Sequence, residues 1–381
     1  MTDLMNVILI ISCTLCGLYF IMTAVFCYGW LNTKENHSSS SGETSVAVIV
    51  AARNEEQYIL KCLDALNSQN YRGKKEFIIA DDGSGDNTAS LIAGFCGMHP
   101  GFRLIRASGA GKKAALAEAI KHTSAELIVT TDADCTMGSK WLESIVALYE
   151  HSGADMIAGP VAFKEENTFF KKLQSLELMA LMGSTAGALY FNKAIMCNGA
   201  NLAYSRELYN KLNGFEGIDH VMSGDDVLLM YKASQESGVT IKFLMDREAI
   251  VSTYAKEDLR SFIEQRKRWA SKSFSLMNSE AKVTALIVYL FSFFLLLMWI
   301  IAGLGALKPM VGLPFLKICL ILSGIKCVID FLLLFLAACF FKKRPYLYLF
   351  LPAQFIYIFY VVVTGFLGNK GKYEWKGRKI N

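Results

Sequence analysis

Two aspartates separated by one residue have the spacing of a cation-binding pair. Asp132 and Asp134 flank Ala133, so in an extended chain both carboxylates point the same way. Together they can hold a hard divalent cation that also contacts the oxygens of a diphosphate. Such a cation neutralises the diphosphate and makes it a better leaving group. An isolated Asp-x-Asp pair is also common in structural turns, so its meaning depends on the elements around it.

A second acidic pair, Asp225-Asp226, comes directly before an apolar run that begins at Val227 and reads as the start of a helix. One of these carboxylates could act as a general base toward an incoming hydroxyl group. The alternative is an N-terminal pair that stabilises the helix dipole. The residues alone leave both interpretations open.

Short β-branched runs alternate with helical patterns in the part of the chain that contains these acids. This rhythm predicts a parallel sheet covered on both faces, with a ligand crevice beyond the carboxyl ends of its strands. The expected strands are 46–51, 77–80, 104–105 and 127–131, and the expected helices are 58–66, 88–95 and 113–120.

Polar segments follow three of these strands, where a ligand crevice would lie. Residues 53–56 follow the first strand, 81–86 the second and 132–134 the fourth. Each segment alone reads as a turn or a helix cap. Three such segments in register favour a shared binding site.

The composition excludes a wholly soluble protein. Of the 381 residues, 53% are hydrophobic and only 19% are charged, with a mean hydropathy of +0.33. A net charge of +5 is too small and too little patterned for a nucleic-acid partner. The ten cysteines show no disulfide pattern, and several of them, including Cys13 and Cys16, lie inside apolar runs, which favours a reducing environment.

Three uncharged segments are each longer than the ~20 residues that cross a bilayer. We interpret 4–33 as an N-terminal transmembrane helix rather than a cleaved signal peptide, because an acid, Asp3, stands where a signal peptide is basic. The other two uncharged segments are 283–307 and 345–369.

Between them, an apolar segment carries charges. Residues 309–341 contain Lys317, Lys326 and Asp330. Lys326 and Asp330 lie four residues apart, so they can pair inside a helical bundle, or both can reach the membrane surface. The predicted domains are therefore the helix 4–33, an α/β domain 45–275 after a Ser-rich linker, a membrane region 282–369 of about three segments, and a basic tail 370–381.

The basic residues create a conflict over topology. Lys342, Lys343 and Arg344 precede the last apolar segment, and five basic residues follow it in the tail. Both clusters cannot face the cytoplasm if the segment crosses once. Either that segment is re-entrant or the tail is an exception. Residues 169–191 pose a second choice, between a helix at the membrane surface and one packed on the sheet.

Five motifs together resemble the membrane-integrated family 2 glycosyltransferases with a GT-A domain. The match covers residues 45–275 and extends to the flanking apolar segments. The last motif is similar to that of a branch containing polysaccharide synthases and lipid glycosyltransferases. In chain order the motifs are Asn54-Glu55, Asp81-Asp82-Gly83-Ser84, Asp132-x-Asp134, Gly224-Asp225-Asp226 and Gln265-x-x-Arg268-Trp269.

The resemblance implies roles for individual residues. Asp226 would be the catalytic base, with Asp225 as the preceding acid, and Asp134 with Asp132 would bind Mg²⁺ or Mn²⁺. Asp132 would also hold the donor sugar. The other implied nucleotide-sugar ligands are Ala52, Asn54, Glu55, Asp82 and Lys112, and the implied residues at the acceptor and diphosphate are Gln265, Arg268 and Trp269.

The resemblance also implies an activity and a location. We expect an inverting glycosyltransferase that moves a sugar from a nucleotide-diphosphate sugar, most commonly a UDP-sugar in this family, to a membrane lipid or lipid-linked acceptor. The alternative is a processive polysaccharide synthase, and a noncatalytic nucleotide-binding scaffold is disfavoured because all the acids are present. The expected location is a bacterial-type inner (plasma) membrane, with the catalytic domain in the cytoplasm.

Overall fold

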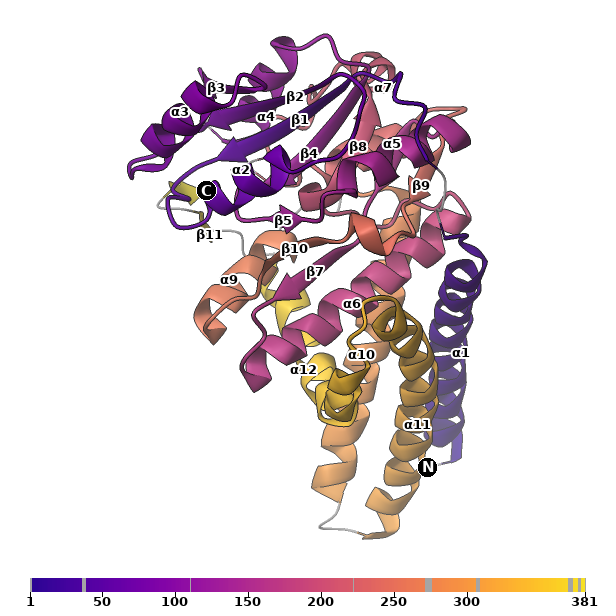
Figure 1. Cartoon of the computed structure of the whole chain (residues 1–381). Helices are drawn as coiled ribbons and strands as arrows, with labels where there is room; N and C mark the ends of the chain where they lie inside the picture. Colours follow the sequence, from indigo (N-terminus) through magenta and orange to yellow (C-terminus); the bar gives the residue numbers. More distant parts are fainter. Residues whose placement is uncertain are drawn as a thin grey trace.

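A computed structural model describes the chain except for residues 1, 36–38, 110, 222, 271–275, 306–308, 369–372, 376–377 and 381. An α/β domain lies at one end of the molecule and a bundle of long apolar helices extends from it (Figure 1). Some of the predicted boundaries lie outside the described residues: the end of the α/β domain, the end of the membrane region, both ends of the tail and the start of the Ser-rich linker.

A seven-stranded sheet forms the centre of the α/β domain, in the order β3-β2-β1-β4-β8-β6-β9. Its inner strands are almost wholly buried, whereas the edge strand β3 buries only Phe102, so hydrophobic burial on both faces stabilises the centre of the sheet. The strands are β1 (Val46–Ala52), β2 (Lys75–Asp81), β3 (Phe102–Arg106), β4 (Leu127–Asp132), β6 (Met156–Ala158), β8 (Leu202–Ser205) and β9 (Ile241–Phe243).

Helices cover both faces of this sheet. The chain passes from β1 to β3 through α2 and α3, then returns through α4, which packs on β1, β2 and β3. All four strands and three helices expected from the sequence are confirmed, with ends that differ by no more than three residues. The domain's helices are α2 (Ile59–Asn67), α3 (Thr88–Met98), α4 (Lys112–Lys121), α5 (Trp141–Ser152), α7 (Arg206–Lys211), α8 (Val227–Gln235), η1 (Gly199–Asn201) and η2 (Arg247–Ala249).

The expectation of a parallel sheet holds for every strand of the central sheet except β8. Strands β3, β2, β1 and β4 are parallel, whereas β8 is antiparallel to both β4 and β6. A single strand–helix–strand crossover imposes parallel pairing. Before β8, however, the chain leaves the sheet through the long helix α6 (Phe169–Tyr190) and returns through η1 from the other direction.

A smaller three-stranded sheet lies beside the central one. It has the order β5-β10-β7, with β5 (Thr136–Met137) antiparallel and β7 (Val161–Lys164) parallel to β10 (Val251–Tyr254). In Figure 1 it lies between the central sheet and the helical bundle. It begins two residues after Asp134 and therefore lies near the expected metal site.

Four apolar helices of the described chain are long enough to span a membrane. They are α1 (Thr2–Asn32), α10 (Ser279–Gly305), α11 (Pro309–Phe340), and α12 (Phe350–Gly368) with the preceding turn η4 (Arg344–Leu349). These helices agree with membrane association. The interpretation in which Lys326 and Asp330 pair inside the bundle is confirmed, because Lys326 is 1% exposed and its Nζ lies 2.5 Å from Asp330 Oδ2.

Helix α6 joins the α/β domain to the bundle. It packs on β7 and β9 on one side and on α1 and α11 on the other, so it is a packed helix whose far side meets apolar helices. Its crossing with α1 is very close: a Cβ atom on Gly29 would lie 2.1 Å from Gly187 O. Two glycines therefore permit backbone contact at the joint.

Both ends of α12 lie on the side of the α/β domain. Before it, Lys343 Nζ donates to Phe163 O of β7 at 2.7 Å and pairs with Glu166 at 2.6 Å. After it, β11 (Tyr373–Trp375) contacts α9 (Leu259–Ala270) and pairs with β12 (Arg378–Ile380). Figure 1 shows β11 beside the α/β domain and the N-terminus at the far end of the bundle. This arrangement favours the re-entrant alternative for α12.

Candidate active site

The candidate site lies where the direction of the strand order reverses. Strand β1 has β2 on one side and β4 on the other, so the loops after β1 and β4 leave the sheet in different directions. Such a switch point opens a crevice at the carboxyl edge of the sheet. The loop containing Asn54 and the segment from Asp132 to Asp134 both start at this edge.

Lys112 connects the two acidic motifs. It begins α4, and its Nζ lies 2.7 Å from Asp132 Oδ1 and 3.0 Å from Asp225 Oδ2. Burial alone would lower the pKa of this ammonium, but Asp132, Asp225 and Asp226 outweigh it and raise the pKa well above its ordinary value. Acids that lie far apart in the sequence are therefore held around one cation.

Asp226 caps α8 and supports the loop opposite. Its Oδ1 accepts from Val227 N at 2.7 Å, and its Oδ2 accepts from Gly199 N at 2.9 Å. The N-terminal interpretation of this acid is thus confirmed. A carboxylate oxygen can accept more than one hydrogen bond, so these contacts are compatible with the role of base, which stays a prediction.

The segment after β2 is packed under the crevice. Asp82 is 2% exposed, and its Oδ1 accepts from Gly111 N at 2.9 Å. Gly111 has a φ of 103°, a conformation that favours glycine. Ala52 is 1% exposed and its carbonyl accepts from Asp82 N, so Ala52 presents almost no surface to a ligand. Asp82 thereby positions the start of α4 and with it Lys112.

The loop after β1 is fastened to the loop after β2. Asn54 is exposed, has a φ of 52°, and accepts through Oδ1 from Gly85 N at 2.9 Å. The backbone N–H of Glu55 donates to Thr88 Oγ1 at 2.7 Å. These contacts hold both loops at the carboxyl edge, where the resemblance predicts nucleotide binding.

Two carboxylates of the Asp132–Asp134 segment suit a hard divalent cation. Ligand atoms of Asp132, Asp134 and Cys135 lie within 4.8 Å of one another. Burial, followed by the charges of Asp134 and Asp132, raises the pKa of the Cys135 thiol well above its ordinary value. A protonated thiol is a poor ligand for Mg²⁺ or Mn²⁺, whereas the two carboxylates fit such an ion.

The residues expected at the acceptor are on α9, which packs on α12 at the bundle side of the domain. Gln265, Arg268 and Trp269 are all half-buried. Between them Arg266 is 3% exposed, and its guanidinium pairs with Glu177 of α6 through two hydrogen bonds of 3.0 and 2.5 Å.

Arg266 also contacts two of the predicted residues. Its Nη1 donates to Gln265 Oε1 at 2.6 Å, and its guanidinium carbon lies 4.2 Å from the centre of the Trp269 ring. Sequence reasoning missed Arg266 and Gly199. A buried arginine inside a basic run leaves no sequence signal, because Arg266 resembles its solvated neighbours until α6 is placed beside it.

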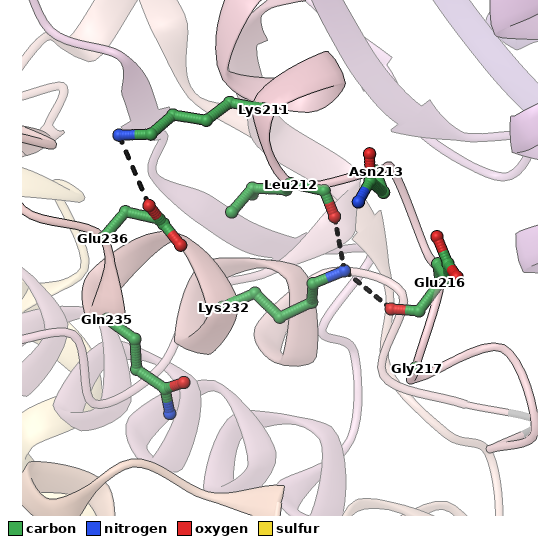
Figure 2. Close-up of a pocket in the computed structure, with 8 residues that line it drawn as sticks. All are labelled: Lys211, Leu212, Asn213, Glu216, Gly217, Lys232, Gln235 and Glu236. Atoms are coloured by element: carbon green, nitrogen blue, oxygen red, sulfur yellow. Dashed lines mark hydrogen bonds and ion pairs between the residues drawn. The ribbon is translucent and has the colours of Figure 1, made fainter.

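A shallow pocket elsewhere has no connection with these motifs. It is lined by residues of α7, α8 and the loop between them, among them Lys232 (Figure 2). Lys232 Nζ donates to the carbonyls of Leu212, Gly214 and Glu216. The ammonium thus closes a loop of the protein rather than facing a ligand.

The comparison with protein families identifies the domain that carries this site. Residues 47–212 match the family model described as Glycosyl transferase family 2. This part of the chain is a family 2 glycosyltransferase domain. The match includes Lys112, Asp132 and Asp134, whereas Asp225, Asp226 and α9 follow the matched range.

Two curated relatives each resemble about half of this chain. The chain is 28% identical over 205 residues to glycosyltransferase AglE of Haloferax volcanii, covering 53% of this chain and 64% of that protein. It is 32% identical over 212 residues to the beta-monoglucosyldiacylglycerol synthase of Trichormus variabilis, covering 51% of this chain and 45% of that protein. The chain therefore spans less than two thirds of the length of these relatives.

A solved structure shares the fold of nearly the whole chain. The mannosyltransferase PcManGT from Pyrobaculum calidifontis, in complex with GDP-Man and Mn²⁺, is 18% identical with a TM-score of 0.59. The likeness covers 94% of this chain and 99% of the other. The family 2 glycosyltransferase domain accordingly has the GT-A fold, which confirms the fold class expected from the sequence.

Proposed function

We propose that this protein is an inverting glycosyltransferase that moves a sugar from a nucleotide-diphosphate sugar to a membrane lipid or lipid-linked acceptor. The observation that carries the proposal is the Lys112 bridge between Asp132 and Asp225. It joins the predicted donor-binding motif and the motif of the predicted catalytic base in one site. The family match supports glycosyl transfer, and the apolar bundle supports an acceptor in the membrane.

Polar and acidic residues at the carboxyl edge of the sheet bind the donor. Asn54, Glu55 and Asp82 position the nucleotide, and Asp132 orients the donor sugar. A divalent cation held by Asp132 and Asp134 would supply charge neutralisation for the diphosphate.

On the acceptor side, Asp226 accepts the proton of the acceptor hydroxyl and Asp225 keeps Lys112 in place. Gln265, Arg268 and Trp269 bound the acceptor and the diphosphate. A single displacement then inverts the anomeric carbon.

The proposed location is a bacterial-type inner (plasma) membrane with the glycosyltransferase domain in the cytoplasm. Two basic groups support this orientation, because Lys342–Arg344 and the described tail residues Arg378 and Lys379 lie on the domain's side of the bundle. Nucleotide sugars would then reach the crevice from the cytoplasm.

The test is sugar transfer by the detergent-purified protein. Radiolabelled UDP-, GDP- and dTDP-sugars are supplied with Mg²⁺ or Mn²⁺ and a bacterial lipid extract, and the products are separated by size and polarity. We expect label in one discrete lipid band, absent with Asp226→Asn and present with the exposed-surface control Lys121→Met. A high-molecular-weight smear would identify a polysaccharide synthase instead, and absence of label with every donor would contradict the proposal.

A further inference from the structure

One face of the small sheet beside Asp134 carries polar side chains that the predicted site does not use. Thr136 of β5 pairs with Ser252 of β10, and Tyr254 of β10 pairs with Lys164 of β7. Directly paired residues share a face of a sheet, and so do alternate residues of one strand. Thr136, Tyr254 and Lys164 therefore lie on one face.

The cation on this face has neutral neighbours. Lys164 Nζ donates to Thr136 Oγ1 at 2.8 Å and lies 4.4 Å from the centre of the Tyr254 ring. The ring of Tyr58, just before α2, lies 4.6 Å from that of Tyr254. All four side chains are half-buried, and within the described part of the chain Lys164 forms no ion pair. An ammonium has three N–H donors, so this one can bind an added anion.

The same cation lies close to the predicted metal ligands. Thr136 follows Asp134 by two residues, which span at most about 7 Å of chain. Burial raises the pKa of the buried Cys62 thiol, Asp134 and Asp132 raise it further, and Lys164 opposes them. Lys164 thus acts on the same thiol as the two carboxylates, from the side of the small sheet.

We propose that Lys164, with Thr136 and the ring of Tyr254 beside it, forms a phosphate-binding subsite of the glycosyltransferase domain. A compact ammonium is suited to phosphate oxygens, and a neutral sugar hydroxyl would gain much less from it. The inference rests on the proposed function and extends it. Two substrates could supply the phosphate: the diphosphate of the donor, or a lipid acceptor that ends in a phosphate.

Equilibrium binding tests the subsite without requiring turnover. The full-length protein in nanodiscs of phosphatidylcholine is titrated, with Mn²⁺, with UDP, GDP, a polyprenyl phosphate and the matching polyprenol. Lys164→Met removes the charge, Lys164→Arg retains it, and Lys61→Met removes an exposed charge on α2 as the matched control. We expect Lys164→Met to weaken at least one phosphate-bearing probe by about tenfold or more, with Lys164→Arg and Lys61→Met close to wild type.

The probes distinguish the two sources of phosphate. Weaker binding of a nucleoside diphosphate assigns the subsite to the donor. Weaker binding of the polyprenyl phosphate, with the polyprenol unchanged, assigns it to a phosphate-bearing acceptor. Unchanged binding of every phosphate probe, or equal losses for polyprenyl phosphate and polyprenol, would overturn the inference. A wild-type protein that binds none of the probes would overturn the proposed function as well.

Discussion

At the scale of single residues, the main feature of the site is the ammonium of Lys112 among the carboxylates of Asp132, Asp225 and Asp226. A pKa raised above the usual 10.5 means that the bridge stabilises the folded protein fully below that pH. The contribution is lost only when the pH rises through the elevated pKa. Between pH 6 and pH 9 the ammonium is therefore always charged, and any change of transfer rate in that range comes from other groups.

The metal ligands can be tested with two neighbouring residues. Asp134→Asn removes a carboxylate, so we expect Mn²⁺ affinity in the presence of UDP to fall by more than the roughly 10–100-fold that loss of an outer-shell partner costs. Cys135→Ala removes a protonated thiol and should leave that affinity within about twofold, a limit we set from the thiol's poor affinity for hard ions. Electron paramagnetic resonance of bound Mn²⁺ measures both. A large loss in Cys135→Ala would show that sulfur is a ligand.

Gly199 tests the geometry of the Lys112 bridge. A Cβ atom there would lie 3.2 Å from Lys112 Nζ and 3.3 Å from Asp225 Oδ2. We expect Gly199→Ala to displace these groups and lower kcat by roughly ten- to hundredfold, because small displacements in an active site are costly. The control is Gly94→Ala on the exposed side of α3, with no atom within 4 Å. It should keep its activity and gain about 0.5–1 kcal/mol of stability. Normal turnover by Gly199→Ala would contradict the role of the bridge.

At the scale of helices and strands, the sequence predicted the elements that have a local hydrophobic pattern. The alternation of strands and helices up to β4 was correct, and so were the polar segments that follow the strands. The antiparallel β8 could not be predicted, because its direction depends on the detour through α6. The contact between Lys112 and Asp225 depends on the same detour, since η1 and α8 both follow it.

The pairing of α9 with α6 leads to a prediction at this scale. Arg266 and Glu177 form a buried ion pair with two hydrogen bonds. Loss of one partner leaves the other charge buried, so we expect Arg266→Met and Glu177→Met each to destabilise the protein by about 3–5 kcal/mol. The double variant should be more stable than either single variant. Thermal unfolding in detergent measures the three differences.

Kinetic measurements on these variants distinguish a role of Arg266 in positioning the acceptor residues from a role in stability alone. Because Arg266 contacts Gln265 and Trp269, the double variant should show a raised KM for the acceptor while the KM for the donor stays near wild type. The control is Lys267→Met, which removes a half-buried charge that pairs with its neighbour Glu264 on the same helix. Equal effects on both substrates would mean that Arg266 only stabilises the fold.

At the scale of the whole molecule, the basic residues and the bundle agree only if α12 is re-entrant. The length of the last apolar segment predicted that it could span a membrane. Length alone does not show whether a segment crosses the membrane or enters and leaves on the same side. The structure adds Lys343 bound to β7 before α12 and β11 in contact with α9 after it. Three helices then cross, and Lys342–Arg344 and the described tail residues Arg378 and Lys379 lie on the side of the glycosyltransferase domain.

Fusion proteins test this arrangement in a bacterial host. Green fluorescent protein fluoresces in the cytoplasm, and alkaline phosphatase is active only after export. Fusions after Phe341 and after Asn381 should both be fluorescent and lack phosphatase activity, because the chain enters and leaves α12 on the same side. A fusion after Gly305, at the far end of α10 (Figure 1), should show the opposite pattern and serves as the control. An active phosphatase after Asn381 would mean that α12 crosses the membrane. The tail would then lie opposite the catalytic domain, against the contact between β11 and α9 and against the positive-inside tendency.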